Sequence, residues 1–498
     1  MFNKILISNR GEIAVRIIRA CNELGVKTVA IYSDADRTSL HVALADEAYH
    51  VGPSAPSASY LVKEKIIEIA KTSKAEAIHP GFGFLAENET FAEMCEKEGI
   101  VFIGPSSKSI RLMGDKVTAR KIAQETGVPL APGSEGAVSD VEAGVIAKKI
   151  GYPIMIKASA GGGGKGMRLV LKEDDFKSSL RMARSEARSS FGDDSVYIEK
   201  FVEQPRHVEI QVIGDLHGNI LHLFERECSI QRRHQKVIEE TPSPAINAKT
   251  RKKMGEVAVK ISEAVSYHGA GTVEFILDQK GNFYFLEMNT RIQVEHPVTE
   301  MVTGFDIVKW MIRIANGEKL PFKQKNITMK GHAIECRVYA EDPEMNFIPS
   351  PGKIVYFRAP NGPGIRNDSS IYSGSEITPF YDPMISKLIV WGETREVAIS
   401  KMISALKEFV VLGVKTNIGF LLRVMANNEF KEGTIDTGFI ERHSDTLKPT
   451  SLDIEPALVA AAIAMRDASH DIEKTKYRPA SNWKLFSRKL GLTRNNML

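Results

Sequence analysis

Hydrophobic and polar positions at the start of the chain follow two different periods. Residues 4–8 are a short apolar run typical of a strand, and residues 13–24 carry apolar side chains at the spacing of one helical face. Gly25 ends this predicted helix, and residues 27–32 are the next apolar run. A strand, a helix and a second strand in this order predict a βαβ unit, and therefore a parallel sheet at the beginning of the protein.

Farther along the chain, the pattern changes to pairs of strands joined by turns. Residues 153–157 and 168–171 predict two strands on either side of a glycine run. Residues 272–276 and 283–286 are two strand-like runs around a short polar turn, which predicts a hairpin. The other strands predicted are residues 75–79, 196–202, 207–212 and 221–224, and the other helices are residues 109–126, 250–267, 397–410 and 417–427. The whole pattern predicts a mixed α/β and α+β protein with a β-rich C-terminal part.

Length and charge limit the class of protein. At 498 residues the chain is too long for one core, so we expect two to four packed units. Its 66 basic and 62 acidic residues are interspersed and leave a net charge of +4, which gives no argument for binding to nucleic acid or to a membrane. No apolar run approaches the roughly 18 residues that a membrane span needs.

The N-terminus and the cysteines predict a cytoplasmic protein. The first residues enter a strand directly and show no signal-peptide pattern. Cys21, Cys95, Cys228 and Cys336 are far apart and form no CxxC pair, so we expect reduced, buried thiols and no zinc site.

The densest chemistry follows the second strand of the predicted hairpin. Glu287 and Asn289 are two apart and share one face of that strand, where their oxygens suit a hard cation such as Mg²⁺. Arg291, Gln293 and Glu295 continue the spacing of two. If the chain stays extended, these side chains line up beside the metal and can hold a small planar anion, with Glu295 as a base. A solvated edge strand is the alternative, which five functional groups in nine residues disfavour.

The glycine run between two predicted strands indicates a loop that closes over phosphates. Residues 161–166 contain the spacing G-x-G-x-x-G, but a strand follows where a dinucleotide fold needs a helix. Gly166 stands where a P-loop needs Ser or Thr, and the first turn of the chain carries only Gly11 of a dinucleotide motif. The N-terminal unit is therefore predicted to be Rossmann-like without binding a dinucleotide. A flexible linker is disfavoured, because glycines between two strands are costly to order.

These motifs resemble those of the biotin carboxylases, which are ATP-grasp ligases. The resemblance rests on EMNTRIQVEHPVTE at residues 287–300, RRHQKVIEE at residues 232–240 and HPGFGFLAEN at residues 79–88, and it extends from Ile5 to about His443. It implies a Rossmann-like N-terminal domain (1–114), an ATP-grasp region (115–330) with a mobile lid at about 132–203, a β-rich C-terminal domain (331–444) and a helical extension (445–498).

The resemblance also implies an activity, in which ATP and bicarbonate are used to carboxylate biotin. Glu295 is then the base on bicarbonate, Arg291 clamps bicarbonate, Arg337 stabilises the biotin oxyanion and Lys236 stabilises carboxyphosphate. The bicarbonate and biotin pocket is implied to consist of Arg291, Gln293, Val294 and Arg337. The residues implied to contact ATP are Lys116, Lys157, Gly162, Gly163, Gly164, Glu199, Lys200, Val202, His207, Gln231, His234 and Ile276. Those implied to hold two Mg²⁺ or Mn²⁺ ions are Glu274, Glu287 and Asn289.

The family further implies a homodimer that works with a biotin carboxyl carrier protein and a separate carboxyltransferase. Carriers hold biotin on the lysine of a Met-Lys-Met turn, a tripeptide that this sequence does not contain. The segment after His443 reads helical and resembles extensions of acyl-CoA carboxylase subunits, with Trp483 and Phe486 as candidate anchors for a partner. It favours acetyl- or propionyl-CoA as the final acceptor, and thus a link to fatty acid biosynthesis, with pyruvate as the alternative.

Two other functions fit part of the pattern. Another ATP-grasp enzyme, such as a carbamoyl-phosphate synthetase or an amino-acid ligase, shares the glycine loop and the Glu-x-Asn pair. Such enzymes do not share the run from Arg291 to His296 or the block from His234 to Lys236. A nucleotide-sensing module without turnover is disfavoured by the complete set of metal ligands and base.

Overall fold

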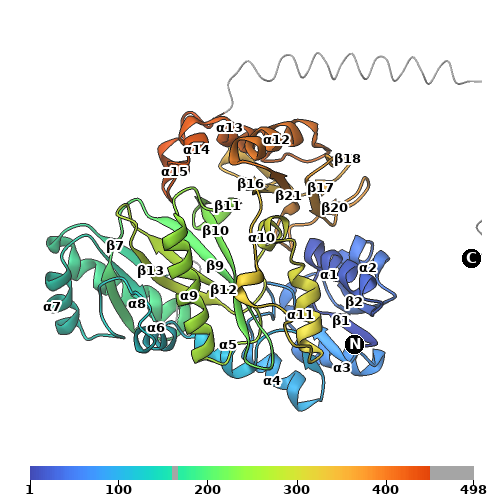
Figure 1. Ribbon diagram of the computed structural model, residues 1–498, viewed down its shortest axis with the longest axis horizontal. Helices are drawn as coiled ribbons and strands as arrows, with labels where there is room; N and C mark the ends of the chain where they lie inside the picture. The colour runs from blue at the N-terminus through green and yellow to red at the C-terminus, as the bar shows by residue number, and fades with distance from the viewer. Residues whose placement is uncertain (160–165, 449–498) are drawn as a thin grey trace, which may run out of the picture. The chain divides into compact units, whose positions relative to one another are not determined.

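The computed structural model describes residues 1–159 and 166–448, and residues 1–447 form one compact unit. A five-stranded, an eight-stranded and a three-stranded sheet are its framework (Figure 1). The four cysteines are free and buried, as predicted. In the described part of the chain, no helix is long and apolar enough to cross a membrane.

The N-terminal sheet is parallel, as the βαβ pattern predicts. Its order is β3-β2-β1-β4-β5, with β1 at Lys4–Ile7, β2 at Lys27–Ser33, β3 at Glu47–Gly52, β4 at Ala77–His79 and β5 at Val101–Phe102. Helix α1 (Gly11–Glu23) ends before Gly25, whose φ of 71° is a left-handed conformation that favours glycine. The strand order reverses between β1 and β4, so the loops after these strands meet at a switch point, where α/β folds place ligands.

The eight-stranded sheet is antiparallel throughout and carries most of the predicted site. Its order is β13-β12-β9-β10-β11-β14-β21-β19. The strands are β9 (Arg206–Gly214), β10 (Ile220–Arg232), β11 (Gln235–Thr241), β12 (Gly269–Leu277), β13 (Phe283–Asn289), β14 (His332–Tyr339), β19 (Ile365–Ser369) and β21 (Met384–Gly392). The predicted hairpin is present as β12–β13, and the sheet continues across the predicted domain boundary at residue 330.

Alternation along β9 divides this sheet into an apolar and a polar face. Val208 and Ile210 pack with Val257 and Ile261 of helix α9 (Ala248–Ala264), which lies across the strands in Figure 1. Burying such side chains stabilises the fold by roughly 1.5–3 kcal/mol each. Because successive side chains alternate, the polar residues of β9, Glu209 among them, point to the opposite face.

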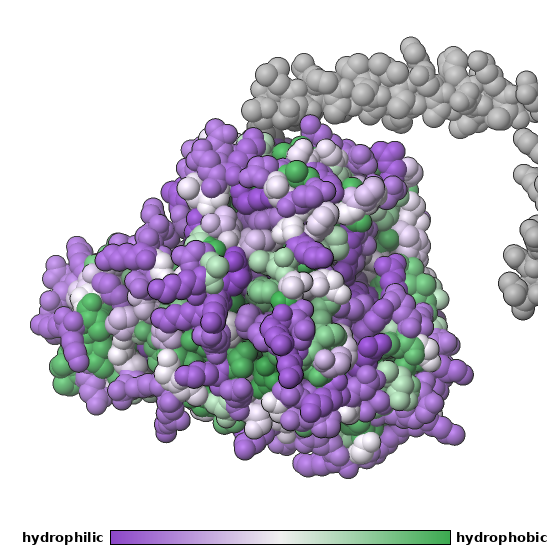
Figure 2. Space-filling model, in the orientation of Figure 1, coloured by the Kyte–Doolittle hydropathy of each residue, from purple (hydrophilic) through white to green (hydrophobic). Residues whose placement is uncertain are grey.

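A three-stranded sheet corresponds to the strands around the glycine run. Strand β6 (Ile154–Ala158) pairs with β7 (Met167–Val170) and β8 (Val196–Lys200), and helices α7 (Asp140–Ile150) and α8 (Phe176–Phe191) supply its core. Figure 2 shows a hydrophobic patch at the edge where Figure 1 places α7, and Val141 and Val145 of α7 are exposed. The glycine residues expected to contact ATP, Gly162, Gly163 and Gly164, lie outside the described residues.

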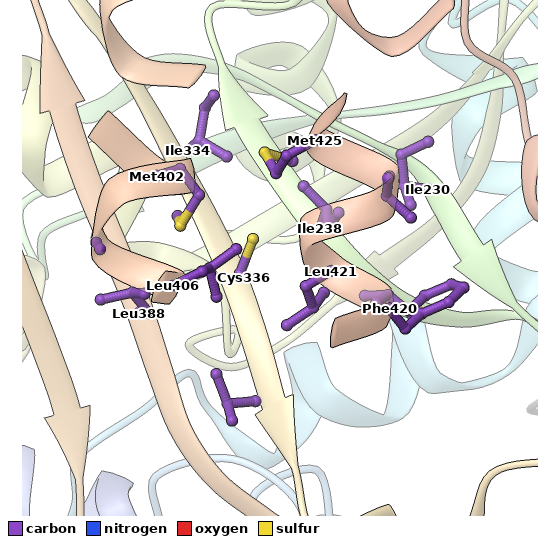
Figure 3. Close-up of a cluster of buried hydrophobic side chains, with 14 of the residues drawn as sticks. Ile230, Ile238, Ile334, Cys336, Leu388, Met402, Leu406, Phe420, Leu421 and Met425 are labelled. Atoms are coloured by element: carbon purple, nitrogen blue, oxygen red, sulfur yellow. The ribbon is translucent and has the colours of Figure 1, made fainter. Parts of the chain in front are cut away.

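Helices α12 (Arg395–Glu408) and α13 (Ile418–Ala426) pack on one face of strands β14 and β21. Cys336 of β14 and Leu388 of β21 pack against Met402 of α12 and Leu421 of α13, as Figure 3 shows. The neighbouring residues of both strands, such as Arg337, therefore point to the face away from this core.

The predicted helix over residues 109–126 is wrong in one respect, because it is two helices. α5 (Ser107–Gly114) ends at Asp115, whose side chain caps α6 (Lys116–Glu125) by accepting a hydrogen bond from the Thr118 amide at 2.7 Å. The remaining helices are α2 (Leu40–Leu44), α3 (Lys63–Ser73), α4 (Glu89–Lys97), α10 (His296–Thr303), α11 (Ile307–Ala315), α14 (Asn428–Glu432) and α15 (Phe439–Arg442). The remaining strands are β15 (Glu341–Asp342), β16 (Ile348–Pro349), β17 (Gly352–Lys353), β18 (Tyr356–Arg358), β20 (Glu376–Ile377) and β22 (Val410–Leu412).

Candidate active site

A half-buried lysine on β11 contacts carboxylates from three elements. Nζ of Lys236 lies 2.6 Å from Oε2 of Glu209 on β9, 2.9 Å from Oε1 of Glu274 on β12 and 2.6 Å from Oε1 of Glu295 before α10. Burial alone would lower the pKa of Lys236, but the three carboxylates outweigh it and raise that pKa well above its ordinary value. Lys236 is therefore a permanent cation at the centre of the site.

Glu295 bridges Lys236 to Arg337, which is buried. Its Oε2 accepts a hydrogen bond of 2.9 Å from Nη2 of Arg337 on β14, whose Nε donates to Oε1 of Glu239 at 2.6 Å. Burial would raise the pKa of Glu295, but the charges of Lys236 and Arg337 outweigh it and hold that pKa below its usual range. At neutral pH, Glu295 is thus ionised and able to accept a proton.

A fully buried arginine, not anticipated from the sequence, orders the amide of the predicted anion pocket. Arg226 on β10 donates from Nε to Glu209 Oε1 at 2.5 Å and from Nη2 to Gln293 Oε1 at 2.9 Å. The Gln293 amide then donates to Glu274 Oε1 at 2.7 Å. The sequence signal was a single arginine within an otherwise strand-like run, which can indicate a buried ion pair.

The expected extended row of Arg291, Gln293 and Glu295 is wrong in its backbone. Strand β13 ends at Asn289, a turn follows, and Glu295 is the N-cap of α10. The physical reason is Pro297, which suits the first turn of a helix because it lacks an N–H group that would stay unpaired there. The turn nevertheless brings Gln293 and Glu295 into one network with Glu274 and Lys236, through the contacts given above.

Arg291 lies at the edge of this network. Its Nη2 donates to Asn289 Oδ1 at 3.0 Å, and its Nε donates to Glu87 Oε2 at 2.8 Å. Glu87 also accepts a hydrogen bond from the Thr290 amide at 3.0 Å. The HPGFGFLAEN segment therefore contributes a carboxylate that orients Arg291, a role that the sequence did not assign to Glu87.

The residues expected to hold metal ions lie on two paired strands. Glu274 on β12 and Glu287 on β13 are register partners, and Asn289 Nδ2 donates to Glu274 Oε1 at 2.9 Å. Nζ of Lys116, at the start of α6, lies 3.4 Å from Glu287 Oε2. Carboxylate and amide oxygens on adjacent strands are the donor set that Mg²⁺ and Mn²⁺ prefer, so these residues fit such ions.

Several residues expected to contact ATP lie near the ends of β6, β8 and β12. Lys157 pairs with Glu199, and Arg120 Nη1 lies 3.3 Å from Glu199 Oε2. The Lys200 side chain donates to the carbonyl groups of residues 151 and 152 at 3.0 Å each. Two apolar positions complete this set, Val202 just after β8 and Ile276 on β12.

The remaining expected nucleotide contacts lie beside Glu274 and at the β10–β11 turn. Nε2 of His207 is 2.9 Å from Glu274 Oε2, and its Nδ1 is 2.8 Å from the Gln231 amide nitrogen. Burial would lower the pKa of His207, but the Glu274 charge outweighs it and raises that pKa. At the turn, Arg233 and His234 have φ values of 50° and 66°, left-handed conformations that are uncommon for such side chains and that cluster at functional sites.

Comparison with known proteins identifies the family. Three family models match in succession, namely the biotin carboxylase N-terminal domain over residues 1–110, the carbamoyl-phosphate synthase L chain ATP-binding domain over 115–323 and the biotin carboxylase C-terminal domain over 335–442. The chain is 56% identical over 444 residues to a pyruvate carboxylase subunit of Methanothermobacter thermautotrophicus, and the match covers 89% of this chain and 90% of that protein. The chain belongs to the biotin carboxylase family.

Two further relatives extend the comparison. The biotin carboxylase domain of the Hydrogenobacter thermophilus 2-oxoglutarate carboxylase, solved as a dimer with MgADP, ADP and bicarbonate, is 50% identical with a TM-score of 0.86, covering 91% of this chain and all of that one. The propionyl-CoA carboxylase α chain of Ruegeria pomeroyi is 49% identical over an alignment of 499 positions, and the match covers 96% of this chain and 73% of that protein. The resemblance and the mixed α/β fold predicted from the sequence are thereby confirmed, and the chain is an ATP-dependent ligase.

Proposed function

We propose that this biotin carboxylase acts on biotin held by a separate carrier protein, with ATP and bicarbonate as co-substrates. The observation that carries the proposal is Glu295, a buried carboxylate held between Lys236 and Arg337 next to the oxygen ligands of Glu274. A base between two cations suits a reaction in which an anion must lose a proton and then attack a phosphate.

In the first step, a bicarbonate oxygen attacks the γ-phosphorus of ATP, and carboxyphosphate and ADP form. Glu295 takes the proton of bicarbonate, Arg291 holds the anion with Gln293 and the Val294 backbone, and Lys236 offsets the charge that develops on the transferred phosphate. Lys236 now donates to three carboxylates. For these roles, the incoming anions must replace part of those contacts.

The same exchange makes Glu295 a better base. A carboxylate whose pKa is held low by two cations is always ionised but has little drive to take a proton. When phosphate and bicarbonate oxygens compete for Lys236 and Arg337, this stabilisation of the Glu295 anion weakens and its pKa rises. Binding of the substrate anions therefore makes Glu295 a stronger base.

In the second step, carboxyphosphate breaks down to CO₂ and phosphate, and the N1 atom of biotin attacks CO₂. The released phosphate takes the N1 proton, and Arg337 stabilises the oxyanion of the biotin ureido group. Glu239 keeps the Arg337 guanidinium in place through the 2.6 Å bond to Nε while Glu295 changes its charge.

The nucleotide is held by residues around the β6–β8 and β9–β13 strands. Glu274, Glu287 and Asn289 would hold two Mg²⁺ or Mn²⁺ ions, which when bound offset the charge of the phosphates. Lys116 and Lys157 are proposed to bind phosphates. The other proposed ATP contacts are Gly162, Gly163, Gly164, Glu199, Lys200, Val202, His207, Gln231, His234 and Ile276.

The final acceptor is proposed to be acetyl- or propionyl-CoA, used by a carboxyltransferase on another chain. Residues 1–447 are about nine-tenths of the sequence, so an alignment over 96% of it must include part of residues 448–498. The match to the propionyl-CoA carboxylase α chain has this extent, whereas the match to the Methanothermobacter pyruvate carboxylase protein covers 89%. A role in a pyruvate carboxylase is the alternative, and assays of carboxyl transfer to each acceptor with purified partner proteins distinguish them.

Assembly and organisation are further parts of this proposal. The biotin carboxylase domain of the Hydrogenobacter enzyme is a dimer, which supports a homodimer here. The four-part domain division at residues 114, 330 and 444 and the cytoplasmic location stay predictions from the sequence.

The deciding experiment for this function is ATP cleavage with and without bicarbonate. ADP release by the purified chain is measured in buffer freed of dissolved CO₂, after addition of bicarbonate, and after addition of free biotin. We expect cleavage to require bicarbonate and to increase with biotin. Equal cleavage in all three conditions would show that the chain is a different ATP-dependent enzyme.

A further inference from the structure

A second buried cation stands directly beside Arg337 on the sheet. Lys387 of β21 is the register partner of Arg337 of β14, and its side chain is fully buried. Like charges at directly opposed positions are destabilising, and burying an ammonium group is costly without partners. Asp368 of β19, the register partner on its other side, and Glu12 of α1 offset part of this cost. Replacing such a buried ion pair by apolar residues is often neutral or stabilising, so the contacts of Lys387 point to a role beyond stability.

The ammonium group of Lys387 joins three distant parts of the chain. Its Nζ donates to the backbone carbonyl of Val294 at 2.9 Å and lies 3.1 Å from Oε1 of Glu12 on α1. It also lies 5.8 Å from the ring centre of Phe82, within the HPGFGFLAEN turn. Lys387 thus connects α1, this turn and the loop that precedes α10.

The contact with Val294 is the one closest to the chemistry. Its carbonyl belongs to the peptide group that joins Val294 to Glu295, so the hydrogen bond fixes the backbone immediately before the proposed base. Gln293, Val294 and Glu295 all belong to the proposed bicarbonate pocket. A turn without regular strand or helix bonds needs such an external partner to keep one conformation.

The pair with Glu12 does not explain the lysine by itself. Burial raises the pKa of Glu12 to about 7, and the charge of Lys387 offsets only part of that effect. Glu12 is therefore partly neutral near pH 7, and the hydrogen bond to the uncharged Val294 carbonyl is the contact of Lys387 that does not depend on this titration.

We propose that Lys387 is a positioning residue that holds the Val294–Glu295 backbone in the conformation that binds bicarbonate. This inference rests on the proposed function and adds a residue that the sequence did not single out. Lys387 acts on bicarbonate indirectly, through the Gln293–Glu295 segment that is proposed to contact it. Its loss should therefore weaken the use of bicarbonate more than the use of ATP, whose proposed contacts lie on other elements.

The test compares two lysines with similar contacts. Lys387→Met removes the bond to the Val294 carbonyl, whereas Lys401→Met removes bonds from a lysine on α12 to the carbonyls of Trp391 and Pro363 at 2.6 and 3.1 Å. We expect Lys387→Met to raise the KM for bicarbonate about ten- to hundredfold, the size expected for loss of a charged hydrogen bond, with the KM for ATP within about twofold. Lys401→Met should leave both constants within about twofold.

A second variant is used if Lys387→Met does not fold because Glu12 has become an unpaired buried charge. The double variant Glu12→Gln/Lys387→Met contains neither charge, and it should fold and show the same rise in the KM for bicarbonate. An unchanged KM for bicarbonate in a folded variant, or an equal rise in the KM for ATP, would overturn the proposal.

Amide hydrogen exchange over residues 290–298 separates this inference from the proposed function, because it needs no turnover. We expect faster exchange of this segment in the double variant than in the wild type, and wild-type exchange in Lys401→Met. If the wild type cleaved ATP without bicarbonate, the proposed function would fail, while faster exchange would still support the positioning role. Unchanged exchange in the double variant would contradict that role.

Discussion

Replacing Glu295 by Gln removes the proposed base and keeps its shape. In the folded protein, Glu295 is 1% exposed and joins Lys236 at 2.6 Å to Arg337 at 2.9 Å. Gln retains one oxygen that can accept one of these hydrogen bonds, but its NH₂ group is a donor and faces the other cation. The change therefore removes proton acceptance and one charged bond while the pocket volume stays the same.

The expected loss can be bounded from these contacts. General-base catalysis contributes about 10²–10⁴-fold, so kcat should fall by that factor, or about 3–5.5 kcal/mol of barrier. Stability should fall by only about 1–3 kcal/mol, because Lys236 keeps Glu209 and Glu274, and Arg337 keeps Glu239. The affinity for ATP should change little, since Glu295 is not among the proposed ATP contacts.

A matched control lies in α10, the helix whose N-cap is Glu295. Glu300 is 7% exposed and also bridges two cations, Arg16 at 3.1 Å and Arg366 at 2.7 Å, but it lies outside the network of Lys236. The assay is ADP release at saturating MgATP, bicarbonate and free biotin. A Glu295→Gln variant that keeps more than about a tenth of the wild-type kcat, or a Glu300→Gln variant with an equal loss, would refute the assignment of Glu295 as the base.

Three further predictions concern Arg337, Glu239 and the carrier. Arg337→Lys should lower kcat by about 10²-fold, because one ammonium group cannot replace a fork that holds Glu239 and Glu295 together; near-normal turnover in the ADP assay would contradict this. Burial raises the pKa of Glu239 to about 7, so the contribution of Glu239 to the unfolding free energy should fall as pH rises from about 4.5 to 7 and stay constant above. Denaturant titrations should show that the unfolding free energy of Glu239→Gln rises relative to that of the wild type by up to about 3 kcal/mol between these pH values. A constant difference between the two proteins across this pH range would contradict the prediction. After co-expression with a biotin ligase, the intact mass should show no added biotin, and a biotinylated lysine would overturn the separate carrier.

The sequence predicts those contacts of the site that lie between strands adjacent in the chain, because alternation and turn residues indicate how such strands pair. Alternation placed β12 and β13 in a hairpin, and the approach of Glu274 to Glu287 follows from that pairing. The predicted strand over residues 207–212 is likewise present as β9, whose alternation places Glu209 on the polar face. Motif resemblance then assigned roles to residues such as Lys236, which the alternation alone would not have distinguished from a solvated lysine.

The remaining features depend on contacts between distant parts of the chain. Arg226 contacts Gln293, and Lys387 contacts Val294, across separations of 67 and 93 residues, which no local periodicity encodes. The turn after Asn289 was missed for a different reason. Pro297 is suited both to the end of an extended segment and to the first turn of a helix, so the local pattern does not distinguish the two.

The transfer of labelled carbon from bicarbonate to biotin tests the central claim most directly. The purified chain is incubated with MgATP, ¹⁴C-bicarbonate and free biotin, and carboxybiotin is trapped at alkaline pH and counted against ADP. We predict labelled carboxybiotin in the wild type, no label when ATP is omitted, and a matching loss of label and ADP in Glu295→Gln. Bicarbonate-dependent ADP release with no label in biotin, under conditions where added carboxybiotin survives, would contradict the account.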